Sequence, residues 1–118
     1  GNDMLSGGKK KDKLIAGAGD DTAKGGGGND TIKGGKGNDM LTGNGGNDRF
    51  VFRKRDGADE ITDFQVGKDK INVIGADELS DLKFTTQGSD VLVEAGKLDI
   101  LVRDVTQTEM ENADNFLF

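Results

Sequence analysis

The fold is decided by two consecutive nonapeptides, GGGGNDTIK at residues 25–33 and GGKGNDMLT at residues 34–42. Both follow the pattern G-G-x-G-x-D-x-U-x, in which U is a large apolar residue. Outward from this pair, looser copies cover residues 7–15, 16–24 and 43–51, with a partial copy at residues 1–6. An aspartate recurs every nine residues, and an apolar residue follows two positions after each one. The aspartates are Asp3, Asp12, Asp21, Asp30, Asp39 and Asp48, and the apolar residues are Leu5, Leu14, Ala23, Ile32, Leu41 and Phe50.

The composition restricts which chemistry this 118-residue chain can carry out. Cysteine and histidine are absent, so a metal ion would meet only oxygen ligands, which favours a hard cation. Without these residues, and without a serine in a nucleophile context, we expect no enzyme activity; a catalytic domain would lie N-terminal to Gly1. The net charge of −6, with no basic helix stripe or aromatic platform, argues against nucleic-acid binding. No apolar run is long enough to span a membrane.

The nine-residue period predicts a flattened coil of short parallel strands. Nine residues are too few for a helical repeat, whereas a glycine-rich turn followed by three extended residues makes half a circuit. Two units then complete a coil of 18 residues, and the apolar residues of successive coils stack inside. We expect one wall to stack Leu5, Ala23 and Leu41, and the other to stack Leu14, Ile32 and Phe50.

The same register stacks aspartates that lie 18 residues apart along the edges of the coils. Carboxylates that lie so close together repel one another unless a cation lies between them. Calcium takes six to eight oxygen ligands, including backbone carbonyls. Glycine-rich turns expose such carbonyls. We therefore expect several calcium ions, roughly four to six, in the turns. The expected ligands are the side chains of Asp3, Asp12, Asp20, Asp21, Asp30, Asp39, Asp48, Asp59 and Asp69, and the carbonyls of Gly17, Gly19, Gly26, Gly28, Gly35, Gly37 and Gly46.

These repeats resemble the RTX (repeats-in-toxin) family of calcium-binding nonapeptides. The resemblance implies an all-β fold, a parallel β-roll with two nonapeptides per 18-residue coil and a small β-rich C-terminal cap. It also implies a secreted bacterial protein that leaves the cell by type I secretion and folds on binding Ca²⁺ outside. Such a module supports the secretion and folding of an N-terminal effector domain, and we expect it to be a monomer.

Departures from the pattern predict unequal turns. Lys10 stands at the fourth position of residues 7–15, where the pattern has glycine, so we expect a weakened or absent site there. Ala16 and Ala23 weaken the next copy, which carries both Asp20 and Asp21. Asn44 stands where residues 43–51 should have glycine. The best sites should therefore involve Asp21, Asp30, Asp39 and Asp48.

Beyond residue 51 the sequence predicts a last coil and then a cap. Two degenerate half-repeats, at residues 57–61 and 67–71, contain Asp59 and Asp69, which could complete the last calcium sites or be ordinary surface acids. Asp63 is a further candidate ligand. We divide the chain into a roll at residues 1–51, a last coil and transition at 52–75, and a β-rich cap at 76–118. In the cap we expect strands at 82–86, 91–94 and 98–102, and a helical turn that begins at Thr106 with a capping box. The expected cap core is Phe64, Phe84, Phe116 and Phe118.

Three alternatives remain open at this stage. Without calcium, residues 1–51 should behave as a disordered glycine-rich linker. An outward face with basic residues could bind an acidic, alginate-like polysaccharide, or could be an ordinary solvated surface. Its residues are Lys13, Ile15, Thr31, Lys33, Arg49 and Val51. The opposite face could act in adhesion through Met4, Ser6, Thr22, Lys24, Met40 and Thr42.

Overall fold

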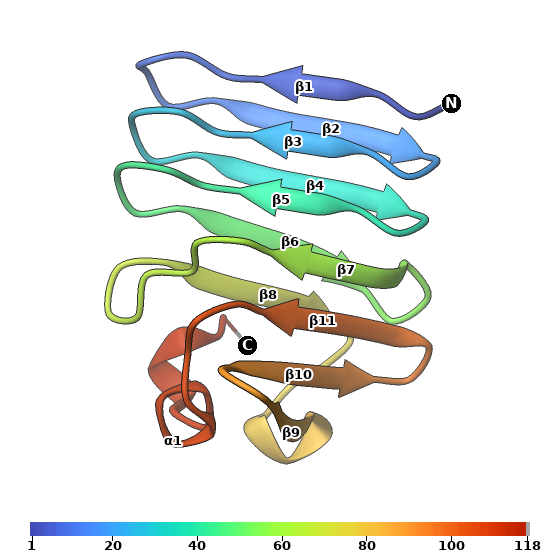
Figure 1. Ribbon diagram of the computed structural model, residues 1–118, viewed down its shortest axis with the longest axis vertical. Helices are drawn as coiled ribbons and strands as arrows, with labels where there is room; N and C mark the ends of the chain where they lie inside the picture. The colour runs from blue at the N-terminus through green and yellow to red at the C-terminus, as the bar shows by residue number, and fades with distance from the viewer. Residues whose placement is uncertain (118) are drawn as a thin grey trace.

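The computed structural model describes residues 1–117 and shows a stack of coils with two facing walls (Figure 1). Sheet 1 begins with β1 (Met4–Ser6), β3 (Thr22–Lys24), β5 (Met40–Thr42) and β7 (Gly57–Ile61). Sheet 2 consists of β2 (Lys13–Ala18), β4 (Thr31–Lys36), β6 (Arg49–Arg53) and β8 (Lys70–Ile74). Neighbouring strands of successive coils pair in parallel. The all-β, parallel coil architecture predicted from the period is confirmed.

The register brings the apolar position of each repeat over that of the preceding coil. In sheet 1 the stack is Leu5, Ala23, Leu41 and Ile61, and in sheet 2 it is Leu14, Ile32, Phe50 and Ile71. Ala23, Ile32, Leu41 and Phe50 have no exposed surface. Leu5 and Leu14 are only partly buried. The core is therefore a double ladder that contributes one inward side chain per repeat, as the sequence predicted.

Glycine is required where adjacent coils approach through their backbones. Gly35 has φ +101°, and a Cβ there would collide with the carbonyl oxygen of Gly17 on the previous coil. Asn44 occupies an equivalent glycine position with φ 65°, a conformation that asparagine tolerates. Gly45 next to it has open space around its α-carbon and no positive φ. Gly35, at the second position of its repeat, is thus required by its backbone conformation and by a close contact, whereas Gly45, at the variable third position, is not.

The C-terminal third extends sheet 1 with antiparallel strands. β11 (Leu98–Val102) pairs in parallel with β7, and β10 (Asp90–Ala95) and β9 (Lys83–Gln87) follow outward. These three strands match the expected ranges within one or two residues. Because β11 continues the wall of the roll, the cap and the roll share one sheet. The division of the chain into three parts stays a prediction.

Short helical turns close the end of the stack beside β8. They are η1 (Leu79–Asp81), α1 (Gln107–Met110) and η2 (Ala113–Asn115). The predicted capping box between Thr106 and Glu109 is present. Phe116 then forms a parallel bridge with Ile71, which covers the outer edge of sheet 2. In the described part of the chain, no helix is long and apolar enough to cross a membrane.

The aromatic residues divide between two parts of the core. Phe84 and Phe116 pack edge to face in the cap, with ring centroids 5.9 Å apart. Phe64, also predicted for the cap core, packs against Phe50 of the roll at 6.4 Å. Phe64 lies in the turn between β7 and β8, which places its ring beside the roll. Phe118 lies outside the described residues.

The two kinds of glycine give a direct test of the backbone argument. Gly35→Ala should lower the free energy of unfolding by at least about 2 kcal/mol, because alanine disfavours positive φ and its Cβ meets the Gly17 carbonyl. Gly45→Ala should change it by no more than about 0.5 kcal/mol. Urea unfolding at saturating calcium measures both. Equal losses for the two variants would contradict this account.

Candidate metal centre

Two rows of aspartates run along opposite edges of the coil stack. Row A lies at the beginning of the strands of sheet 1, just before β1, β3 and β5 and within β7, and row B lies just before the strands of sheet 2. Row A contains Asp3, Asp21, Asp39 and Asp59, and row B contains Asp12, Asp30, Asp48 and Asp69. The two half-repeats beyond residue 51 therefore supply the fourth member of each row. Insertions make their spacing 20 and 21 residues instead of 18.

Each row is held together by one oxygen of each carboxylate. The Oδ1 atom accepts a hydrogen bond from the backbone N–H of the aspartate one coil earlier. In row A, Asp21, Asp39 and Asp59 accept at 2.6, 2.8 and 2.9 Å. In row B, Asp30, Asp48 and Asp69 accept at 2.8, 3.0 and 2.9 Å. These bonds fix the carboxylate groups and aim the second oxygen away from the ladder.

The second oxygen of five of these carboxylates is buried and has no hydrogen-bond partner in the protein. The atoms are the Oδ2 atoms of Asp21, Asp30, Asp39, Asp48 and Asp59. The residues themselves are at most 4% exposed. Leaving even one such oxygen unpaired costs about 1–3 kcal/mol, and more when it is charged. Five repeated at equivalent positions indicate sites that a cation fills.

The other three row aspartates, Asp3, Asp12 and Asp69, do not have a buried Oδ2 atom without a partner. Asp12 Oδ2 accepts from Gly8 N–H at 2.8 Å, and Asp69 Oδ2 accepts from Gln65 N–H at 2.8 Å. The turn before Asp12 is the one in which Lys10 replaces glycine, and neither Gly8 nor Lys10 has a positive φ. Asp3 is exposed and lies just before the edge strand β1. The turns before Asp12 and Asp69 thus satisfy the second carboxylate oxygen with a backbone N–H group of the same turn.

Asp20 and Asp63 use their carboxylates for backbone hydrogen bonds. Asp20 is exposed, and its Oδ1 accepts from Asn38 N–H at 2.8 Å. Asp63 accepts from Gly43 N–H at 2.9 Å and from Asn44 N–H at 2.7 Å, one oxygen for each. Both acids were expected as ligands, and the structure places neither among the unpartnered oxygens.

Asp20 belongs to a second ladder, which the sequence analysis missed. At the fifth position of the repeat, a side-chain oxygen accepts from the backbone N–H of the equivalent residue one coil later. The pairs are Asn2 with Asp20, Asp20 with Asn38, Asn38 with Ala58, and Asn29 with Asn47. The signal was the recurrent asparagine before the aspartate, a position that the pattern left variable.

The predicted glycines line the space between the coils. The carbonyl oxygens of Gly17, Gly19, Gly28 and Gly37 face the α-carbons of Gly35, Gly37, Gly46 and Gly57, so closely that a Cβ would overlap them. Gly26 likewise faces the Gly8 carbonyl. In addition, the α-carbons of Gly25, Gly34 and Gly43 lie beside the Oδ2 atoms of Asp30, Asp39 and Asp48. No side chain occupies these positions, so carbonyl and carboxylate oxygens alone define them.

This donor set fits calcium. Within residues 1–117, no three acidic side chains cluster as a metal-binding group. Backbone carbonyls must therefore complete a shell around the paired carboxylates, which is chemistry that calcium accepts and that nitrogen-preferring or sulfur-preferring metals do not.

Burial and repulsion between carboxylates raise the pKa of four row carboxyls, those of Asp39, Asp48, Asp59 and Asp69. Burial is the main cause, and it raises the pKa of Asp48 to about 6 and that of Asp59 to about 8. Asp69 and Asp30 add repulsion at Asp48, and Asp39 and Asp56 add it at Asp59. The pKa of Asp39 and that of Asp69 are also raised, again chiefly by burial. These four carboxyls therefore ionise less readily than a free aspartic acid.

These shifts predict how the metal-free chain responds to pH. A carboxyl whose pKa is raised by folding stabilises the folded state below its unfolded pKa of 3.8, and this contribution disappears as the pH rises through its folded pKa. For Asp48 this loss of stability takes place between about pH 4 and about pH 6, and for Asp59 between about pH 4 and about pH 8. In excess chelator, the β-sheet circular dichroism signal should be stronger near pH 4.5 than near pH 8.5. A stronger signal at the alkaline end would be incompatible with this assignment.

Known proteins show the same repeat and fold. The model of the RTX calcium-binding nonapeptide repeat matches residues 1–32 and 24–52, whereas no curated protein matches the chain. Among solved structures, the AlgE6R3 and AlgE6R2 subunits of the Azotobacter vinelandii mannuronan C5-epimerase superpose with TM-scores of 0.74 and 0.67 at 24% and 25% identity. The alignments cover 99% and 97% of this chain, and 78% and 91% of those subunits.

The extracellular lipase LipA from Serratia marcescens is also similar, with a TM-score of 0.64 and 27% identity over 98% of this chain. The present chain spans 20% of that lipase. The matched repeats, the stacked coils and the paired aspartate rows agree with one another. Residues 1–52 thus carry the RTX calcium-binding nonapeptide repeat, and the stacked-coil fold of the solved structures extends over nearly the whole chain.

Proposed function

We propose that the chain is a folding module of an extracellular protein and becomes ordered when calcium binds outside the cell. The observation that carries this proposal is the set of five buried Oδ2 atoms without partners. Asp21, Asp39 and Asp59 would hold ions along row A, and Asp30 and Asp48 along row B, together with glycine carbonyls of the turns. Bound calcium supplies the positive charge that the stacked carboxylates lack.

The thin core explains why folding depends on the ions. Each repeat buries one apolar side chain, and in one copy that residue is only Ala23. Ordering nine residues costs roughly 1–2 kcal/mol each in backbone entropy alone, more than one buried side chain returns. The free energy of ion binding therefore has to become folding free energy. In a low-calcium cytosol the chain would stay unfolded, which suits type I export.

A partner domain N-terminal to the repeats would benefit from this behaviour. The support is the lipase, an extracellular enzyme in which a segment like this chain is one fifth of the length. The effector activity would belong to that partner, while this chain contributes calcium-dependent order. We propose the module as a monomer with several ions.

The direct test is the folding of the full chain in calcium. Circular dichroism should change from a coil-like spectrum in chelator to a β-sheet spectrum in millimolar calcium at pH 7.5. Magnesium should be much less effective, because it demands a small octahedral shell and releases water reluctantly. An equally β-rich spectrum in chelator would refute calcium-driven folding.

A matched pair of substitutions tests the assignment of ligands. Asp39→Asn places an amide N–H₂ or a neutral oxygen where the unpartnered Oδ2 lies, so the calcium midpoint for folding should rise at least about tenfold. Asp20→Asn keeps the acceptor that bonds Asn38 N–H, and asparagine stands at this position in other copies. Its midpoint should stay within about twofold of the wild type. Equal shifts for the two variants would argue against the Oδ2 atoms as ligands.

A second candidate function is binding of an acidic polysaccharide by the outer face of sheet 2. The observation that favours it is charge, because β2, β4, β6 and β8 contain Lys13, Lys33, Arg49, Arg53 and Lys70 but no acidic residue. The epimerase whose subunits superpose on this chain is named for mannuronan, a polymer of acidic sugars. Salt-sensitive retention on an immobilised polyuronate would support this candidate, and no retention would dismiss it. For the opposite wall, proposed for adhesion, no observation favours a ligand.

A further inference from the structure

The turn at residues 43–48 is the last turn of row B that follows the repeat pattern, and its first hydrogen bond differs from that of the earlier turns. In the earlier turns of row B, the N–H of the first glycine donates to a backbone carbonyl of the next coil. The pairs are Gly7 with Lys24 and Gly25 with Thr42, both at 2.8 Å. The equivalent Gly43 N–H donates instead to the side chain of Asp63, at 2.9 Å to Oδ1. A carboxylate thus takes the place of a main-chain carbonyl.

An inserted residue explains this exchange. Thr42 and Thr62 are still matched in successive coils, with their hydroxyl oxygens 2.6 Å apart and a spacing of 20 residues. At Asp48 and Asp69 the spacing has become 21 residues. The extra residue therefore enters between these two points, where Asp63 lies. The backbone leaves the register of the coil there, and the Asp63 side chain supplies the acceptor that Gly43 N–H would otherwise lack.

Asp63 holds two successive backbone N–H groups at once. Its Oδ1 accepts from Gly43, and its Oδ2 accepts from Asn44 at 2.7 Å. Hydrogen bonds to an ionised acceptor are roughly twice as strong as those between neutral groups. Because Asp63 lies about 20 residues away in sequence, the pair of bonds joins two coils and fixes the beginning of the turn at residues 43–48.

The backbone that Asp63 holds lies beside the unpartnered oxygen of Asp48. A Cβ on Gly43 would overlap Asp48 Oδ2, so no side chain separates the two. The end of the same turn is fixed by Asp69, whose Oδ1 accepts from Asp48 N–H at 2.9 Å. Burial is the main cause of the raised pKa of Asp48, and the charge of Asp63 adds to it, so this carboxylate acts on the site electrostatically as well. The loop between β7 and β8 thus holds both ends of the turn.

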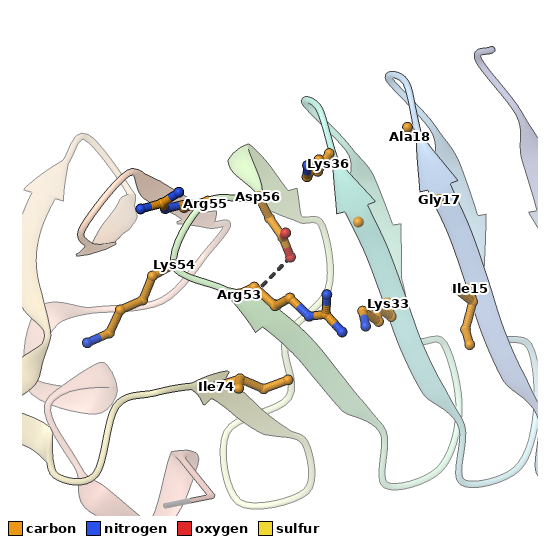
Figure 2. Close-up of a pocket in the computed structure, with 11 residues that line it drawn as sticks. Ile15, Gly17, Ala18, Lys33, Lys36, Arg53, Lys54, Arg55, Asp56 and Ile74 are labelled. Atoms are coloured by element: carbon orange, nitrogen blue, oxygen red, sulfur yellow. Dashed lines mark hydrogen bonds between the residues drawn. The ribbon is translucent and has the colours of Figure 1, made fainter.

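The end of row A shows what an extra acid does when no such exchange is needed. Asp56 is buried, and its carboxylate accepts from Arg53 N–H at 2.8 Å, three residues earlier in the same turn (Figure 2). The link to the preceding coil is still made by the main chain, because the Asp56 carbonyl accepts from Gly37 N–H at 2.8 Å. The Asp56 side chain therefore shapes its own turn, whereas the Asp63 side chain joins two turns.

We propose that Asp63 is a positioning residue for calcium at Asp48, and that it acts by holding Gly43 and Asn44 against the next coil. The inference rests on the proposed function, because it takes Asp48 Oδ2 to bind calcium. It adds that the last site of row B is completed by an acid outside the repeat, which acts through the turn and not as a ligand. With Asp63 in place, an ion meets a turn that is already ordered; without Asp63, part of the binding free energy is spent on ordering it.

The test is a double-mutant cycle on the full chain, with the folding equilibrium constant measured by urea unfolding at one fixed millimolar calcium concentration. Asp63→Asn removes the charge and one of the two acceptors, so it should lower this constant at least about tenfold. In an Asp48→Asn background, where the site is already lost, the same substitution should lower it less than about threefold. In an Asp39→Asn background, which affects row A, the full decrease should remain. Equal decreases in the two backgrounds would overturn the inference.

Asp81 provides the matched control. Its Oδ2 also accepts from two successive backbone N–H groups, those of Asp77 at 2.9 Å and Glu78 at 3.3 Å, but it lies in the cap and outside both rows. Asp81→Asn should therefore have the same effect in the wild type and in the Asp48→Asn background. A dependence on Asp48 as large as that of Asp63→Asn would show that the cycle reports general destabilisation, and would overturn the assignment.

Counting bound ions by equilibrium dialysis separates positioning from direct ligation and needs only single variants. At saturating calcium, Asp63→Asn should bind as many ions as the wild type, whereas Asp48→Asn should bind one fewer. Loss of an ion in Asp63→Asn would make Asp63 a ligand and refute the positioning role. If calcium does not fold the wild type, the proposed function fails and this inference fails with it. If calcium folds the wild type and the two backgrounds respond equally, the inference alone fails.

Discussion

The structure depends on the carboxylate oxygens that the protein buries without a partner. One oxygen of six of the eight row aspartates is fixed by a backbone N–H of the neighbouring coil, and in five of them the other oxygen is buried without a partner. Such a group is unfavourable by itself, which the raised pKa of Asp59 expresses. The ladder of hydrogen bonds therefore both assembles the coils and creates the demand for a cation. Neither the core nor the sheets could satisfy that demand.

The exceptions in row B show what a turn needs when no ion is available. At Asp12 and Asp69 the second oxygen accepts a hydrogen bond from the backbone four residues earlier. The chain thus has two ways to close the same turn: an internal N–H or a cation. The turns that use N–H flank the Asp30 and Asp48 turns, so the ion-dependent part of row B is bounded on both sides. Lys10 belongs to one of these flanking turns, where glycine is no longer needed for close approach.

The period of the sequence was enough to predict the coil, the parallel register and the inward residues, because each repeat presents one apolar position and one aspartate at fixed spacing. It was also enough to place Asp59 and Asp69 in the next coil. The ladder at the fifth position was missed because the repeat pattern treats that position as variable, although asparagine recurs there. Asp20, which was expected as a calcium ligand, is part of this ladder through its Oδ1 atom. The packing of Phe64 on Phe50 and the joining of β11 to β7 depend on where the chain turns back, which insertions after residue 51 leave undetermined.

The edges and faces of this roll cannot act independently. A strand in sheet 2 passes directly into a turn of row A, as β4 does between Lys33 on the face and Asp39 at the edge. Six residues of backbone therefore link a cation on the outer surface to a carboxylate that would hold calcium. A ligand that requires those residues in one conformation stabilises that conformation for the other ligand as well. In a solenoid with so thin a core, a ligand that bound the ordered strands would contribute to the same folding equilibrium as a bound ion.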